Sequence, residues 1–307
     1  MLSLSTCWNS HRFTEGQHIV SEARGCGFEW IEISHGTSIS LFPGLLECLQ
    51  AGQIRVSSVH NFCPSPVAVM IDAPDAYEFT SHRKEDRERA ISLTKKSIET
   101  AVRFGADRVV LHMGSAAMKP FTDQLEEMAH QGAAYSRKYT ELKLRFVQER
   151  QKHSAFYLER AKSALEELLP VAESHRVKLA IETRSHFEQV PSESEMLRLL
   201  SDFPDHPWLG AWHDFGHVQR QANLGLLNHA QYLAAISPRL IGCHVHDVDW
   251  PAKDHRIPFT GGDVDFDHLL PLLPADIPLV WELSPSQKRL QITERLVEWR
   301  NRYPHLG

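Results

Sequence analysis

Short apolar runs recur along the chain, and segments with helical spacing separate them. Eight of the runs are rich in β-branched and aromatic residues, which is typical of strands buried on both faces. The first two cover 2–8 and 28–35, and the other six end at His60, His112, Glu182, Asp214, His244 and Glu282. In the intervening segments apolar residues repeat at helical spacing, as in Ala161, Leu165, Leu168 and Ala172 or in Ile91, Ile98, Ala101 and Val102.

Strands that alternate with helices eight times predict an α/β fold, a single (β/α)8 TIM barrel over residues 1–307. In such barrels the active site lies at the carboxyl ends of the strands, where the six polar side chains fall. The alternative, a doubly wound open sheet, would not bring the ends of runs three to eight around one centre. Because burying a charged or metal-binding group is costly unless it is paired or binds a cation, we expect the six to form one site.

The segment 119–175, between the fourth and fifth predicted strands, is charged and long enough for two helices. We expect Gln124–Gln151 to be an added helix near the mouth of the barrel. It either lengthens the fold as a solvated helix or serves as a lid or an oligomer contact. The sequence leaves these alternatives, and a homo-oligomer, open.

Composition narrows the class of protein. The 307 residues are 42% apolar, which can furnish the core of one barrel, and the net charge of −6 offers no basic footprint for nucleic acid. Five cysteines form no CxxC pair and no signal peptide is evident, so we expect reduced thiols in the cytoplasm. No apolar run is long enough to span a membrane.

The polar ends of the last four runs provide a mixed oxygen and nitrogen ligand set. It consists of Glu182, Asp214, His244 and Glu282. Without a thiolate this is not a closed structural zinc site, and three carboxylates favour a harder ion with open positions. We therefore expect one divalent metal ion, Mn, Mg, Co or Zn, as a cofactor.

Four short motifs lie at these ends: I-E at 181–182, D-x-x-H at 214–217, H-x-H-D at 244–247 and E-L-x-P at 282–285. In this order they resemble the xylose-isomerase-like barrels, a family that includes sugar isomerases and epimerases, inosose dehydratase and endonuclease IV. The resemblance covers essentially the whole chain. It implies that Glu182, Asp214, His244 and Glu282 hold the divalent ion, and that His246 supports the site or packs beside it.

Two features point to different branches of that family. His60 and His112 match histidines that hold an additional zinc in endonuclease IV; alternatively they are hydrogen-bond donors that orient Glu182, or His112 contacts substrate. The nuclease also uses a later D-x-H motif, which reads Asp254-His255-Arg256 here, with arginine in place of the final histidine. His255 replaces that ligand only if the loop shifts its register by one residue.

Residues 256–258 resemble the R-V-P of ketose epimerases, which implies that Arg256 contacts substrate; alternatively it pairs with Asp254 or Asp263. Glu188 lies six residues after Glu182, the spacing of a substrate-binding glutamate in ketose 3-epimerases. His217 contacts substrate or hydrogen-bonds backbone. Trp8 and Trp250 either form an apolar wall for a sugar ring or pack in the core.

The resemblance implies a metal-dependent isomerase or epimerase that acts on a sugar or related polyhydroxy carbonyl compound through an enediolate. Glu182 and Glu282 would be the general base and acid. A keto-sugar or inosose dehydratase or lyase on the same metal site is one alternative, and a multi-zinc DNA-repair nuclease is another. A barrel that has lost catalysis and only binds a ligand is the least favoured. We expect a small sugar-like substrate and neither nucleic acid nor a membrane as partner.

Overall fold

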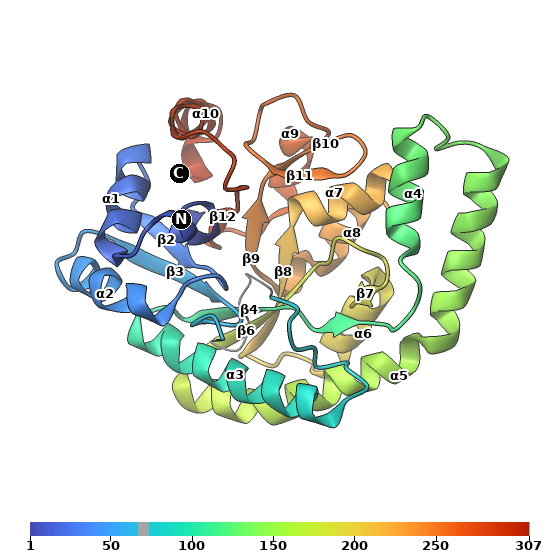
Figure 1. Ribbon diagram of the computed structural model, residues 1–307, viewed down its shortest axis with the longest axis horizontal. Helices are drawn as coiled ribbons and strands as arrows, with labels where there is room; N and C mark the ends of the chain where they lie inside the picture. The colour runs from blue at the N-terminus through green and yellow to red at the C-terminus, as the bar shows by residue number, and fades with distance from the viewer. Residues whose placement is uncertain (67–73, 307) are drawn as a thin grey trace.

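The computed structural model describes residues 1–66 and 74–306, and a closed barrel of parallel strands stands at its centre (Figure 1). The strands are β1 (Leu2–Ser5), β2 (Trp30–Ile33), β3 (Arg55–His60), β4 (Arg108–Leu111), β6 (Lys178–Glu182), β8 (Leu209–Asp214), β9 (Leu240–Val245) and β12 (Leu279–Trp281). They pair in chain order, and β1 closes the barrel by pairing with both β2 and β12. The predicted TIM barrel is confirmed, and the open sheet is excluded.

The first two strands are shorter than the apolar runs that predicted them. After β1 the chain turns into a short 3-10 helix at Thr6–Trp8, and β2 ends at Ile33. The Thr6 hydroxyl accepts the backbone N–H of Ser34 and lies 3.1 Å from the hydroxyl of Thr37. These local hydrogen bonds join the two loops and take the place of further strand pairing.

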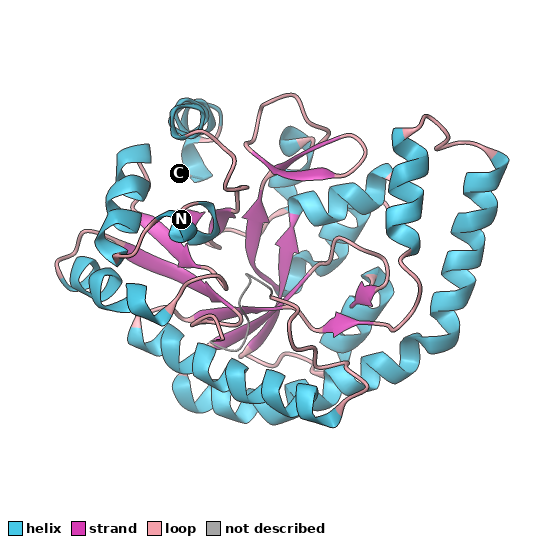
Figure 2. Ribbon diagram, in the orientation of Figure 1, coloured by secondary structure: helices cyan, strands magenta, loops and turns pink. Residues whose placement is uncertain are grey.

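Helices surround the barrel (Figure 2). They are α1 (Gly16–Cys26), α2 (Phe42–Gln50), α3 (Lys84–Arg103), α5 (Arg137–His175), α6 (Glu193–Asp202), α7 (Phe215–Asn223), α8 (His229–Ile236), α9 (Phe266–Leu269) and α10 (Arg289–Arg302). The apolar stripe predicted on 161–172 is buried in α5. On α3 the prediction was wrong for Val102, which is exposed, because the buried face also uses small and polar residues such as Ala90 and Ser97.

The insertion is a helical hairpin, so the prediction of one added helix over Gln124–Gln151 was wrong. Helix α4 (Phe121–His130) ends before a turn in which Gly132 has a φ of 79°, and Ser136 then caps the start of α5 by accepting the N–H of Tyr139. From there α5 continues over 39 residues to His175 and packs against α3. Phe121 and Phe146 stack between the two helices of the hairpin (Figure 1, right).

Two small antiparallel two-stranded sheets lie in the loops that follow barrel strands. Strand β5 (Gly114–Ser115) pairs with β7 (Gln189–Val190), and β10 (Asp247–Asp249) pairs with β11 (Lys253–Arg256). They fix the loops after β4, β6 and β9 at the carboxyl end of the barrel. Elsewhere, no helix in the described part of the chain has the length and apolarity needed to cross a membrane.

A buried histidine pair on the outer face of the barrel makes stability depend on pH. The Nε2 atoms of His213 on β8 and His229 on α8 lie 3.0 Å apart, and burial lowers the pKa of His213 from 6.5 to about 3. Between these pH values the unfolded chain binds a proton that the folded chain does not, so stability falls as pH falls below 6.5. We expect this residue to contribute about 2 kcal/mol of destabilisation from pH 7 to pH 5.

Urea unfolding of His213→Leu at pH 7 and pH 5 tests this expectation. The variant should lose less stability than the native chain over that interval. His18→Leu, at an exposed position, is the matched control and should keep the native pH slope. An unchanged slope in His213→Leu would contradict the assignment.

Candidate metal centre and active site

The site is one layer of side chains above an apolar layer inside the barrel. Val110, Ala180, Trp212 and Val280 form a buried cluster from four strands. Successive side chains of a strand alternate between its faces, so the residue two positions further on points to the same interior. Those residues are His112, Glu182, Asp214 and Glu282. The register of the strands therefore brings polar side chains from different parts of the sequence to one level.

The four predicted metal ligands lie together. Ligand atoms of Glu182, Asp214, His244 and Glu282 are within 4.8 Å of one another, and all four residues are buried. The Nδ1 of His244 is 3.2 Å from Glu182 Oε1 and 3.5 Å from both Asp214 Oδ2 and Glu282 Oε2. Three carboxylates thus converge on one imidazole nitrogen in a buried space.

The other nitrogen of His244 shows why this arrangement suits a cation. His244 Nε2 is 3.1 and 3.2 Å from the two carboxylate oxygens of Glu32, which is fully buried on β2. Because a carboxylate only accepts, Nε2 carries the proton in the neutral ring and Nδ1 turns its lone pair toward the carboxylates. A lone pair facing three carboxylates needs a positive charge between them, and a divalent ion fits this donor set.

Protons and a metal ion compete for this cluster. Burial opposes charge on His244, but Glu282, Glu32 and Glu182 outweigh it and raise the pKa of His244 well above its ordinary value. Burial alone would raise the pKa of Glu182, yet His112 and His244 hold it well below the usual range. Since a bound ion needs deprotonated ligands, metal affinity is expected to fall at low pH.

Asp214 ends β8 and also caps α7. Its Oδ1 accepts the backbone N–H of His217 at 2.7 Å, and His246 Nε2 lies 2.9 Å from Oδ1 and 3.1 Å from Oδ2, the oxygen that also faces His244. The D-x-x-H spacing therefore places a histidine backbone N–H where a helix N-cap needs it. Gly216 is required between them, because a Cβ there would lie 1.9 Å from the His246 ring.

His60 and His112 both contact Glu182 through its second oxygen. Their Nε2 atoms are 3.1 and 2.9 Å from Glu182 Oε2. Their Nδ1 atoms face acceptors, the Asn61 carbonyl and the Asp75 carboxylate, each at 2.9 Å, so Nδ1 carries a proton in both rings. The geometry accommodates either a second proton on each ring or a second ion that Glu182 would bridge.

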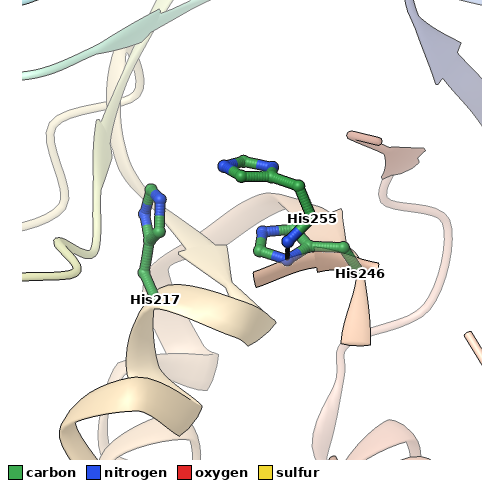
Figure 3. Close-up of side chains that lie close together, drawn as sticks. All are labelled: His217, His246 and His255. Atoms are coloured by element: carbon green, nitrogen blue, oxygen red, sulfur yellow. Dashed lines mark hydrogen bonds between the residues drawn. The ribbon is translucent and has the colours of Figure 1, made fainter. Parts of the chain in front are cut away.

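Three further histidines gather beside the cluster (Figure 3). Each of His217 and His255 has its Nδ1 close to a backbone carbonyl, that of Thr183 at 3.1 Å and that of Glu282 at 3.0 Å. His246 accepts the His255 backbone N–H at Nδ1, and its ring stacks on that of His255 with centroids 4.2 Å apart. Nearly parallel stacked rings do not aim their lone pairs at one point, so we interpret this group as support for Asp214 and not as an ion site.

Arg256 forms an ion pair within its own hairpin. Its Nη1 lies 3.4 Å from Asp249 Oδ2 within the β10–β11 hairpin, whereas Asp254 pairs with Arg220 at 2.6 Å. The neighbouring His255, with a φ of 51°, lies against Glu282 instead. In this loop the histidine therefore contacts Glu282, while the arginine pairs within the hairpin. Neither salt-bridge partner expected for Arg256, Asp254 or Asp263, is the one observed.

Glu188 contacts the inserted helix, and Trp8 packs in the core, the second of its two expected roles. The Glu188 carboxylate accepts the backbone N–H of Thr122 at 2.8 Å and the Thr122 hydroxyl, so it binds the start of α4. Trp8 is fully buried and donates its indole N–H to the Gln287 carbonyl at 2.9 Å, with no open face for a sugar. Trp250 is 45% exposed. His217, in contrast, is next to the cluster, with Nδ1 3.3 Å from Glu182 Oε1.

The sequence interpretation missed Glu32, Asp75 and Arg184. Glu32 had a visible signal, since it is a charged residue within the apolar run 28–35. Asp75 lies in a long loop and contacts both His112 and Arg184. Nothing in the sequence around it indicates that proximity.

Comparison with known proteins places the fold and the family. A D-tagatose 3-epimerase-like protein is similar in structure, with 18% sequence identity and a TM-score of 0.71 over 99% of this chain and 98% of that chain. The IOLI protein with a binding zinc atom has 14% identity and a TM-score of 0.67 over 100% of this chain and 99% of that chain. The probable 3-DHS dehydratase AsbF of Bacillus anthracis has 17% identity and a TM-score of 0.65 over 98% of this chain and 99% of that chain. No curated protein matches in sequence. The family model described as xylose isomerase-like TIM barrel matches residues 20–303. The chain therefore belongs to the xylose isomerase-like TIM-barrel family.

Proposed function

We propose that the protein is a metal-dependent isomerase or epimerase of a polyhydroxylated carbonyl compound. The observation that carries this proposal is the convergence of Glu182, Asp214, His244 and Glu282 within 4.8 Å, with His244 held in the tautomer that presents Nδ1. When bound, the metal ion would polarise a carbonyl and stabilise an adjacent enediolate. Structural neighbours described as epimerases and as a dehydratase agree with this class of chemistry.

Glu282 is the better candidate for the general base. Burial would raise its pKa, but His244 and His255 hold it at about 2, so the carboxylate is ionised at neutral pH. Its carboxylate lies 3.5 Å from His244 and 3.7 Å from His255, longer than a hydrogen bond to a charged group, so its oxygens can approach a substrate C–H.

Glu182 is placed to return the proton. In the barrel, β8 and β9 separate its strand from that of Glu282, so a substrate above the cluster would lie between the two carboxylates. Its Oε2 lies 3.1 Å from His60 Nε2 and 2.9 Å from His112 Nε2, and as general acid Glu182 would carry a proton taken up from solvent. Removal of a proton by one carboxylate and its return by the other, on the opposite face, would invert the carbon.

Solvent exchange tests the proposal directly. Metal-loaded protein is incubated with a panel of ketoses in D₂O, and proton NMR follows the C–H bonds next to the carbonyl. We expect deuterium to enter that position together with a new isomer or epimer. Loss of water to an enone would identify a dehydratase, and no exchange with any ketose alongside cleavage of abasic DNA would favour the nuclease.

The number of bound metal ions distinguishes the isomerase proposal from the multi-zinc nuclease alternative without an activity assay. We expect one divalent ion per chain, lost in His244→Ala and kept in His112→Ala, because His112 is not one of the four proposed ligands. Elemental analysis of the purified variants measures this. Two or more ions in the native chain, with one lost in His112→Ala, would instead assign an ion to His60, His112 and Glu182.

A further inference from the structure

Arg184 is a buried arginine next to the metal centre that the proposed mechanism does not use. It follows Glu182 by two residues, and its side chain is 2% exposed. Its Nη2 donates to Asp75 Oδ2 at 2.9 Å, and Asp75 Oδ1 contacts His112. Since His112 contacts Glu182, this short chain of contacts links Arg184 to the cluster.

Two of the three guanidinium nitrogens of Arg184 lack a partner. Within residues 1–66 and 74–306, Nε and Nη1 are buried and neither makes a hydrogen bond. A buried donor without an acceptor is unfavourable, and more so when it belongs to a charged group. Folded proteins rarely retain such donors unless a ligand or ordered water accepts from them.

Other buried arginines of the chain are used more fully. Arg108 donates through all three nitrogens, to Asp107 and to the Ile241 carbonyl. Arg150 makes two hydrogen bonds, both through Nη2, to the Gln189 carbonyl and the Glu195 carboxylate, and its Nη1 is also buried without a partner among the described residues. Among the described residues, Arg184 is the one of these three with two buried nitrogens that lack a partner, and its Asp75 contact places it beside His112 and Glu182.

Asp75 fixes one side of the Arg184 guanidinium and leaves the rest for a ligand. A planar guanidinium matches a carboxylate, with which it can form two parallel hydrogen bonds. A dianionic phosphate would be opposed by the negative charges of Asp75, Glu182, Asp214 and Glu282 more strongly than a carboxylate with a single charge.

We propose that Arg184 binds a carboxylate of the substrate, so that the compound turned over is a polyhydroxylated acid and not a neutral sugar. This inference rests on the proposed function, because it assigns the substrate class of the same site. Arg184 thereby anchors one end of the substrate while the hydroxyl and carbonyl oxygens at the other end meet the metal centre.

Calorimetric binding to metal-loaded protein provides the test. The probes are D-fructuronate and D-fructose, which differ by a carboxylate in place of a terminal CH₂OH, and D-fructose 6-phosphate. We expect D-fructuronate to bind about 10- to 100-fold more tightly than D-fructose to the native chain, the range of a charge-assisted hydrogen-bond pair. Arg184→Gln should abolish this preference with less than about a threefold change for D-fructose.

Arg198→Gln is the matched control, since it removes an exposed arginine on α6 and should keep the native preference. Arg184→Lys keeps the positive charge and should keep part of the preference for D-fructuronate. Metal content of each variant reports whether the site is intact. An equal loss of affinity for both sugars in Arg184→Gln, no preference in the native chain, or a preference for the phosphate would overturn the assignment.

The deuterium exchange described above distinguishes the two proposals. Exchange with neutral ketoses, combined with equal binding of acid and sugar, overturns the role of Arg184 and leaves the isomerase proposal standing. A carboxylate preference that depends on Arg184, without exchange in any compound of the panel including D-fructuronate, supports the role of Arg184 and overturns the isomerase proposal.

Discussion

Replacement of Glu282 by glutamine is expected to lower kcat by about three orders of magnitude even when the metal is saturating. The amide keeps the size of the side chain and one oxygen that can face the cluster, but it cannot take a proton from carbon. Metal affinity should fall as well, because a ligand loses its negative charge. The measurement is steady-state turnover across a metal titration, with the ketose that shows deuterium exchange.

Glu294→Gln is the control for the charge change, since Glu294 is exposed on α10. It should retain native turnover. Adding metal should restore occupancy of the Glu282→Gln site without restoring the rate. Recovery of near-native kcat at saturating metal, for this variant and for Glu182→Gln, would exclude the mechanism with two glutamates.

Replacement of Glu32 by glutamine is expected to weaken metal binding by about 10- to 100-fold although Glu32 does not face the ion. Its carboxylate holds the proton of His244 on Nε2 and also accepts from Ser5 and Ser58. An amide can turn its NH₂ toward His244, which favours the tautomer whose Nδ1 carries the proton and cannot ligate. Competition with a chelating dye measures the affinity.

Glu29→Gln provides the comparison, because Glu29 precedes the same strand but its side chain is 61% exposed and pairs with Arg55 at the surface. It should leave metal affinity unchanged. Glu32→Asp, which retains a carboxylate, should recover part of the loss. Native affinity in Glu32→Gln would show that the orientation of His244 does not depend on this contact.

The sequence was sufficient to predict the barrel and to group four residues that the structure brings together. Strands buried on both faces leave a continuous apolar run, and a polar residue at its end is conspicuous. Because the strands are parallel, these ends meet at one edge, so Glu182, Asp214, His244 and Glu282 could be grouped without any knowledge of loop geometry.

Contacts made by loop residues could not be predicted from the sequence. Whether His255 or Arg256 turns inward depends on one backbone φ angle, and adjacent residues exchange sides when that angle changes. Glu188 has the spacing of a substrate ligand, yet the inserted helix α4 supplies a backbone N–H that binds it. Asp75 contacts Arg184 across more than a hundred positions of sequence, a pairing that no local pattern encodes.

Asp214 both caps a helix and belongs to the proposed metal site, which affects how this chain can evolve. One carboxylate ends a barrel strand, caps helix α7 and belongs to the proposed metal site, so a mutation there is expected to damage both folding and the proposed chemistry. Selection for a stable chain alone would therefore preserve this acid after catalysis had been lost. Persistence of Asp214 in a lineage is weak evidence of activity, whereas Glu282, which caps no helix, is free to drift as soon as the reaction is no longer needed.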